Sequence, residues 1–403
     1  MSITNQVRPV HVPEDNVVDI DIYAIPGGEK DFHGAWKSLQ TDTRSDVVWT
    51  PYNGGHWIVT RGKEIMEILK DHTRFSSKGV YIPKPEKIEH VLLPLQADQP
   101  EHTEYRRAIN MSVAPKFVLG MREPIRALAK EIAEELAPKG ECEFIEQVAD
   151  MLPIKLFLAF AGLPMEDFQK LRPLGASFVR RDENTDEDLM FSVTNEYLEP
   201  LIKERMSNPG EDLFSQVFAT PISGEKMTHE VAMGIGRDLL LAGLDTVSSH
   251  VGFIGYHLAQ NPDQRKLLIE QPKLIPTAVD DLMRRYNAVL LNREATEDLE
   301  LGGVEMKKGD LISVPLPLYN LDDRIFDDPM NTILDKPRGE HLAFGMGIHR
   351  CPGNSLARLE LIIFLEEWLK HIPDFSIDQD RPLTMSSGIV GTINQLHLVW
   401  PTN

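Results

Sequence analysis

The fold of this chain is decided by residues 344–353, which read Phe-Gly-Met-Gly-Ile-His-Arg-Cys-Pro-Gly. Gly347 stands four residues before Cys351 and Gly353 two after it, and glycine lets a backbone turn sharply and approach a large planar group. Residues 354–368 follow with helix formers and with apolar positions at helical spacing. Cys351 is therefore predicted to lie just before a helix N-terminus, where the dipole and free amides favour a thiolate. Such a thiolate suits a soft or borderline metal, of which haem iron is one.

A lone cysteine is more often an inert buried thiol than a ligand. Here, however, the pattern Phe-x-x-Gly-x-x-x-Cys-x-Gly resembles the haem-thiolate loop of the cytochrome P450 monooxygenases. The resemblance covers nearly the whole chain and is strongest to the soluble bacterial camphor hydroxylases, at residues 53–57, 244–247 and 372–377. It implies haem b with Cys351 as its axial ligand, and one domain over residues 1–403, mainly α-helical with a small β region.

The bulk properties agree with a single large domain, because no linker, repeat or charge block divides the 403 residues. The net charge of −20 argues against nucleic acid and anionic membranes as partners. Two cysteines give no disulfide framework, which fits a reducing compartment. The N-terminus is polar, and no apolar run approaches the roughly 20 residues that span a bilayer. We therefore expect a cytoplasmic protein without a membrane anchor, most simply a monomer.

Two strands are predicted at residues 47–49 and 56–60, joined by the hairpin signal Asn-Gly-Gly at 53–55. The β region should comprise residues 45–62 and 295–320, and the helical core residues 100–290 and 354–370. The longest helical pattern runs over residues 227–260, with Thr228 as its N-cap and Val231 just inside.

Within that helix, Gly243 and Thr246 both weaken the backbone ladder. They are either tolerated or produce a distortion that opens a groove for oxygen and water. The resemblance to cytochrome P450 implies the second interpretation, with Asp245 and Thr246 delivering protons to bound dioxygen.

Several residues are predicted around the haem. His102 and Arg106 are four apart and share a helix face, which alone is more often a solvated face than a site. The resemblance implies that the propionates are bound by His102, Arg106, Arg293 and His349, and that Phe344 and Gly353 flank the cofactor. The family carries Glu-x-x-Arg as a buried ion pair, whereas this chain has Asp281 and Arg284. Aspartate is one methylene shorter, but we still expect the pair to form, since breaking a buried pair costs about 3–5 kcal/mol.

Residues 76–100 form a proline-rich stretch that is either a surface connection or a binding loop. The resemblance implies a substrate-lining loop. The substrate-pocket residues implied are Tyr81, His90, Leu95, Asp238, Leu241, Ala242, Val289, Ile389 and Val390. His90 stands where camphor hydroxylases carry a tyrosine that donates to the substrate ketone, and Asp238 where they carry an apolar residue. A terpenoid or norisoprenoid ketone is therefore expected in preference to camphor.

The activity implied is hydroxylation of an unactivated C–H bond with dioxygen. Two electrons would come from an acidic 2Fe-2S ferredoxin and its NADH-dependent reductase. Arg106 and Arg358 lie on the cysteine side by resemblance and would receive this ferredoxin, although Arg106 is otherwise a propionate ligand only and Arg358 a solvated helix residue. Two other classes stay open. One is a haem protein that uses peroxide or catalyses a rearrangement without oxygenation, and the other is a haem-free protein that binds hydrophobic ligands.

Overall fold

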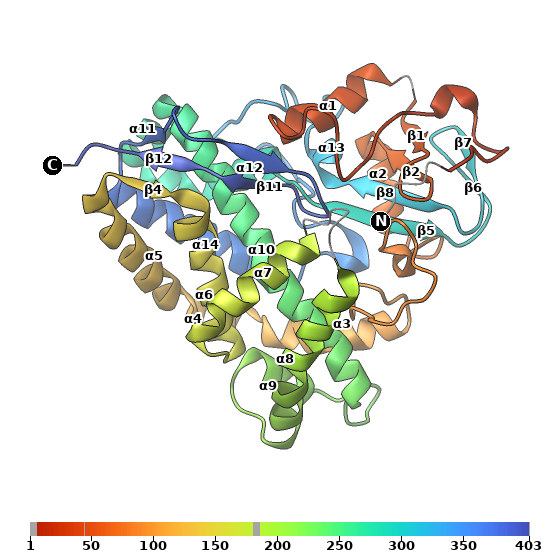
Figure 1. Ribbon diagram of the computed structural model, residues 1–403, viewed down its shortest axis with the longest axis horizontal. Coiled ribbons are helices and arrows are strands. Elements are labelled where there is room, and N and C mark those ends of the chain that lie inside the picture. Colours follow the sequence, from red (N-terminus) through yellow and green to blue (C-terminus); the bar gives the residue numbers. More distant parts are fainter. Residues whose placement is uncertain (1–5, 44, 180–185, 403) are drawn as a thin grey trace.

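The longest helix, α10 (His229–Gln260), runs through the middle of the molecule (Figure 1). The computed structural model describes residues 6–43, 45–179 and 186–402. Thr228 Oγ1 accepts a hydrogen bond from the Val231 amide at 3.3 Å, so the predicted N-cap is confirmed. The helices α6 (Met151–Ala161), α7 (Phe168–Val179) and α8 (Glu187–Ser207) pack against α10. Because apolar residues surround α10 on most sides, it is buried over much of its length.

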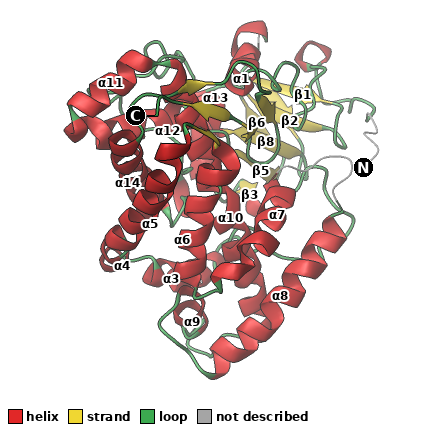
Figure 2. Ribbon diagram, turned by 60° about the vertical axis from the view of Figure 1, so that its left-hand side comes forward, coloured by secondary structure: helices red, strands yellow, loops and turns green. Residues whose placement is uncertain are grey.

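A second group of helices lies beside the cysteine loop. Here α14 (Asn354–His371) packs against α5 (Arg122–Leu136) and α12 (Ile275–Arg285). The other helices of the helical region are α3 (Glu101–Ser112), α4 (Pro115–Gly120), α9 (Leu213–Phe218) and α11 (Pro262–Glu270); α4 and α11 pack against α14, and α9 packs against α3 and α8. Figure 2 shows the helices filling most of the molecule, with the strands gathered at one corner.

The main sheet has five strands in the order β1-β2-β8-β5-β3. The strands are β1 (Val47–Thr50), β2 (His56–Val59), β3 (Phe75–Ser76), β5 (Leu290–Ala295) and β8 (Leu311–Pro315). The predicted hairpin is confirmed, with Val47 opposite Val59. Most of β5 lies before residue 295, where the predicted β region begins. The sequence does not predict this strand because its largely buried residues lack the alternation that marks a half-exposed strand. The helices α1 (Phe32–Asp42), α2 (Gly62–Lys70) and α13 (Leu316–Asn320) lie around this sheet.

Three smaller sheets complete the fold. They consist of β4 (Glu141–Glu143) with β12 (His397–Val399) and β9 (Ser376–Ile377), of β10 (Thr384–Ser386) with β11 (Thr392–Gln395), and of β6 (Leu299–Leu301) with β7 (Val304–Met306). Cys142 is buried in β4 opposite Leu398. The predicted class, mainly α-helical with a small β region in one domain, is confirmed. None of the helices in the described ranges is both long and apolar enough to cross a membrane.

Candidate active site

The cysteine loop is fixed by short-range hydrogen bonds and one tight contact. The Cys351 amide donates to the Phe344 carbonyl at 2.9 Å, and Asn354 Nδ2 donates to the Cys351 carbonyl at 2.9 Å. Gly347 has φ +73°, and a Cβ atom there would lie 2.2 Å from the Leu69 carbonyl oxygen. Only glycine fits this position, since other residues would meet both strain and a backbone clash. Cys351 therefore lies where the sequence predicts it, just before the start of α14.

The thiol of Cys351 does not ionise on account of the helix alone. Burial raises its pKa, and this effect outweighs the Gly353 amide and the Arg106 guanidinium, which lower it. The amide at the helix start therefore acts in the predicted direction, and burial opposes it. A bound metal cation would supply the missing stabilisation, because a coordinating thiol is deprotonated outright.

Four side chains from three segments form what we call the donor cluster: His102 and Arg106 of α3, Arg293 of β5, and His349 of the cysteine loop. The rings of His102 and His349 lie 4.2 Å apart between centroids. Burial lowers the pKa of His102 to about 4 and that of His349 to about 2, with Arg106 adding to the effect in both, so each ring is neutral near pH 7. Burial also lowers the pKa of Arg293 to about 10.

The donor cluster has no acidic partner of its own. Within the described part of the chain, neither Arg106 nor Arg293 has a carboxylate at ion-pair distance, and the buried ring nitrogens of His102 lack hydrogen-bond partners. Arg106 donates instead to the Arg350 carbonyl and to Asn110. Buried cations without a counter-charge are costly, and a ligand that carries carboxylates would satisfy them. The residues present therefore fit the two propionates of a haem.

The accessible face of α10 carries Asp238, Ala242 and Thr246, four residues apart. Ala242 is exposed although Leu241 and Leu244 beside it are buried. Thr246 Oγ1 donates to the Ala242 carbonyl at 3.1 Å, which is the i−4 bond expected of a mid-helix threonine. Asp245 is buried on the neighbouring face.

Gly243 has a packing role. A Cβ atom at this position would lie 2.4 Å from the Phe157 ring of α6, so the glycine lets α6 approach closely. α10 is α-helical through this segment, and the Thr246 hydroxyl bonds the Ala242 carbonyl within it.

The loop at residues 77–100 is tied to α10 and α8. The Leu93 amide donates to the Gly234 carbonyl of α10 at 3.1 Å, and Arg237 Nη1 of α10 donates to the Val91 carbonyl at 3.4 Å. A cleft of about 630 Å³ opens between this loop, α3, α8 and the first turns of α10. His90 packs against Phe191 of α8, with 4.8 Å between ring centroids, and burial lowers its pKa.

The other predicted pocket residues fall into two groups. Leu95, Val289 and Ile389 are half-buried, whereas Tyr81, Leu241 and Val390 are buried. Val289 pairs with Val390, and the Leu290 amide donates to the Ile389 carbonyl at 2.8 Å. The C-terminal segment thus returns beside β5, as the sequence predicts.

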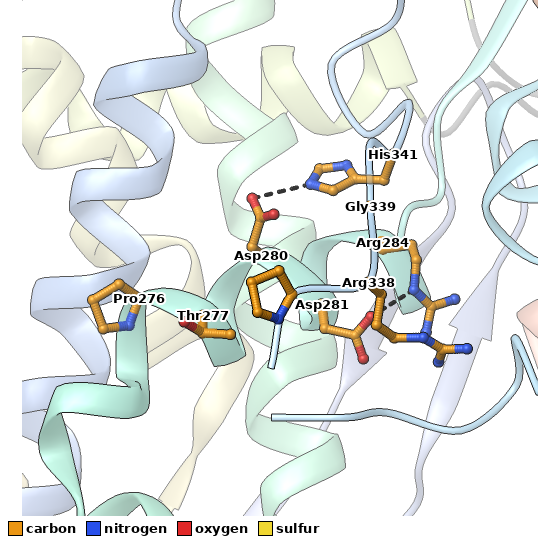
Figure 3. A pocket seen from close by; sticks show the side chains of 9 residues that line it. Pro276, Thr277, Asp280, Asp281, Arg284, Arg338, Gly339 and His341 are labelled. Carbon is orange, nitrogen blue, oxygen red and sulfur yellow. Dashed lines mark hydrogen bonds and ion pairs between the residues drawn. The ribbon is translucent and has the colours of Figure 1, made fainter. Parts of the chain in front are cut away.

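The ion pair between Asp281 and Arg284 forms despite the shorter acid. Arg284 Nε donates to Asp281 Oδ1 at 2.6 Å, and both side chains are almost fully buried (Figure 3). The Arg284 guanidinium also donates to the carbonyls of Asn320, Pro329 and Asn331 at 2.8–3.0 Å, while Asp281 Oδ2 accepts from the Ile333 amide at 2.6 Å. The pair therefore holds the segment that leads to the cysteine loop.

Arg358 is not the solvated helix residue that one interpretation of the sequence predicts. Its Nε donates to Asp280 Oδ1 at 3.0 Å, and its guanidinium lies 4.6 Å above the Phe344 ring. Asp280 also contacts His341 Nε2 at 3.1 Å, and the two side chains point toward each other in Figure 3. Arg358 thus braces the cysteine loop, and much of its charge is already compensated.

Comparison with known proteins decides the family. The cytochrome P450 family profile matches residues 178–395. Probable cytochrome P450 127A1 of Sinorhizobium fredii is 30% identical, over 98% of this chain and 97% of that protein. The chain belongs to the cytochrome P450 family. Nocardicin C N-oxygenase of Nocardia uniformis is 29% identical over 85% of this chain and 88% of that protein.

Solved structures agree with this P450 over nearly its full length. Cytochrome P450 CYP101C1 is 39% identical with a TM-score of 0.90, covering 98% of this chain and 100% of that chain. CYP101J2 is 36% identical with the same TM-score and the same coverage. The protein is thus a P450 monooxygenase, and its cofactor is haem b held by a cysteine thiolate.

Some residues of this P450 site carry no sequence signal of their own. Arg358 contacts Asp280 and His341, which lie 78 and 17 residues away from it in the sequence. Phe157 of α6 packs so closely against Gly243 that a larger residue would clash. These partners depend on how the helices pack, which one sequence does not specify.

Proposed function

We propose that this P450 hydroxylates a terpenoid or norisoprenoid, a camphor- or ionone-like ketone. We further propose that its two electrons come from a 2Fe-2S ferredoxin with an NADH-dependent reductase. Two similarities support this: the camphor-hydroxylase-like motifs at residues 53–57, 244–247 and 372–377, and the 36–39% identity to the two CYP101 structures.

The observation that carries the proposal is the accessible face of α10. It runs from Asp238 through Ala242 to Thr246 and is set among buried apolar residues. Apolar walls with few polar groups suit a small hydrophobic substrate. The resemblance to the camphor hydroxylases implies that the haem lies between this face and the Cys351 loop.

The haem-holding residues would act as follows. Cys351 would be the axial thiolate, and Phe344 and Gly353 would flank it in the loop. The donor cluster would take the propionates, with Arg106 and Arg293 giving charge-assisted hydrogen bonds. Haem b, when bound, supplies the activation of dioxygen needed to oxidise an unactivated C–H bond.

The distal residues would manage protons. The Thr246 hydroxyl donates to the Ala242 carbonyl in the resting helix and can rotate toward a ligand on the accessible face. Asp245, one residue earlier, would exchange protons with it. Both residues of the acid–threonine pair are present, which favours oxygenation over peroxide use or rearrangement.

The substrate would be enclosed by the loop at 77–100, by α10 and by the returning C-terminal segment. Val289 and Ile389 would form one apolar wall and Leu95 another. The expected hydrogen bond from His90 to a ketone needs its ring to turn from Phe191, where it now packs.

Product analysis with isotopically labelled dioxygen tests this function. Purified protein, ferredoxin, reductase and NADH are incubated with β-ionone and with camphor. We expect β-ionone to gain one labelled oxygen atom and to react faster than camphor. Product formed only with hydrogen peroxide would support the peroxide-driven alternative, and no product with either would reject this substrate class.

A further inference from the structure

Asp238 is an interior carboxyl group without a partner in the described part of the chain. No hydrogen-bond donor or ion-pair partner among those residues reaches its oxygens, and Arg106 is the charged group that acts on it. Surrounding protein raises the pKa of Asp238 to about 7, yet the residue keeps part of its surface accessible. Its accessible surface lies on the same face of α10 as the accessible surfaces of Ala242 and Thr246.

The position of Asp238 on α10 identifies that space. Asp238, Ala242 and Thr246 share one helix face, since residues four apart lie above one another. With a rise of about 1.5 Å per residue, Asp238 lies roughly 12 Å from Thr246 along the axis, and Ala242 lies midway. Its charge acts on Arg106 of α3 and on Cys351 of the loop. Asp238 thus lies on the face of α10 that the proposed function assigns to the substrate.

The chemistry of this carboxyl sets what it can hold. A carboxylate is a hydrogen-bond acceptor only, and leaving one unsatisfied inside a protein is costly. Arg106 and Arg237 do not satisfy it: Arg106 donates to Arg350 and Asn110, and Arg237 donates to Asn195 and to the Val91 carbonyl. A hydroxyl or ammonium donor on a bound ligand would complete its hydrogen bonds in place of water.

We propose that Asp238 determines substrate specificity by accepting a hydrogen bond from a hydroxyl or ammonium group of the substrate. The inference rests on the proposed function and narrows it. Terpenoids or norisoprenoids that carry such a donor, with or without a ketone, are selected over those that carry only a ketone. The apolar residue of camphor hydroxylases at this position could make no such selection.

A matched ligand series tests this role. The probes are β-ionone, β-ionol and the primary amine with the same carbon skeleton, titrated at pH 8 into haem-loaded protein by the Soret shift and by calorimetry. We expect wild-type protein to bind β-ionol about tenfold more tightly than β-ionone, the size expected of a hydrogen bond to a charged group. Asp238→Leu should abolish this preference. Asp238→Asn should keep the preference for the hydroxyl and lose the one for ammonium, which separates the two donor chemistries.

The controls keep the test decisive. Asp263→Leu removes an exposed acid in the first turn of α11 and should leave all three dissociation constants unchanged. Haem content and the reduced carbon monoxide spectrum verify that each variant is folded. The same β-ionol to β-ionone ratio in wild type and Asp238→Leu would overturn the role of Asp238 while leaving the proposed function intact. Absence of binding of all three probes to wild type would overturn both.

Discussion

Asp281 meets Arg284 one turn along α12, with 2.6 Å between Oδ1 and Nε, where cytochrome P450 enzymes generally carry the longer glutamate. Both carboxylate oxygens of Asp281 are satisfied: Oδ1 accepts from Arg284 Nε, and Oδ2 accepts from the Ile333 amide. The Arg284 guanidinium donates four hydrogen bonds. One goes to the Asp281 carboxylate, and the others go to backbone carbonyls of the segment that leads to the cysteine loop. The pair is therefore a structural brace for the loop.

Removing Asp281 should destabilise the protein. Asp281→Ala leaves Arg284 buried and unpaired, so we expect a loss of about 3–5 kcal/mol and little haem-loaded protein. Asp281→Glu should be tolerated better. The measurements are denaturant unfolding and the haem-to-protein ratio. Asp280→Ala is the control on the same helix; its half-exposed ion pair should be worth no more than about 1 kcal/mol. Equal losses in the Asp280 and Asp281 variants would show that the buried pair has no special role.

Cys351 should be the residue responsible for the thiolate spectrum. Cys351→Ala should abolish the red-shifted Soret band of the reduced carbon monoxide complex. Cys142→Ala should keep the band, because Cys142 is buried in β4 and burial raises the pKa of its thiol far above the usual range. A normal band in Cys351→Ala would reject this assignment.

Thr246 should couple reduction to product formation. Thr246→Ala removes a positioned hydroxyl, and loss of a proton-transfer group commonly slows the step about 10²–10⁴-fold. Haem and substrate binding should persist while NADH consumption yields hydrogen peroxide. Thr246→Ser retains the hydroxyl and should retain most product. The measurement is product and peroxide formed per NADH; wild-type product yield in the Ala variant would contradict the role.

The parts of this fold that could be predicted carry local signals. The cap at Thr228, the hairpin between Val47 and Val59, and the helix after Cys351 each depend on residues close together in sequence. The long-range partners could not be predicted from residue types. Phe157 beside Gly243 and Asp280 beside Arg358 arise from helix packing. The burial that raises the pKa of the Cys351 thiol likewise depends on packing, whereas the amides at the helix start that lower it can be predicted from the sequence.

The ferredoxin-docking proposal is best tested at Arg350. This residue is exposed beside Cys351 and has no ion pair among the described residues, whereas Arg358 is held by Asp280 and Phe344. Arg350→Glu should slow ferredoxin-driven reduction at low salt, because surface charges act mainly on encounter rate. Rising salt should narrow the gap to wild type, since the Debye length is about 8 Å at physiological strength. Reduction by dithionite and the substrate-induced spectral shift should stay unchanged. An unaltered rate at low salt would put the docking site elsewhere.

As the pH rises, affinity for a ketone should fall and affinity for an amine should increase. Burial raises the pKa of Asp238 to about 7, and Arg106, which opposes this, stays charged throughout. Below pH 7 the protonated carboxyl can donate to a ketone, so β-ionone affinity should be greatest there and fall as pH rises, by at most about tenfold per pH unit. Above pH 7 the carboxylate pairs with ammonium, so affinity for the matched amine should rise until the amine itself deprotonates near pH ~10.

Asp238→Asn distinguishes this mechanism from other titrations in the site. Asparagine keeps the size of the side chain and has no proton to lose, so both pH slopes near 7 should disappear. The neighbouring Arg237 and the Arg106 guanidinium do not titrate in this range, and burial lowers the pKa of His90 away from it. Dissociation constants of β-ionone and the amine, measured from pH 6 to pH 9 in both proteins, provide the test. Slopes that persist in Asp238→Asn would assign the titration to another group.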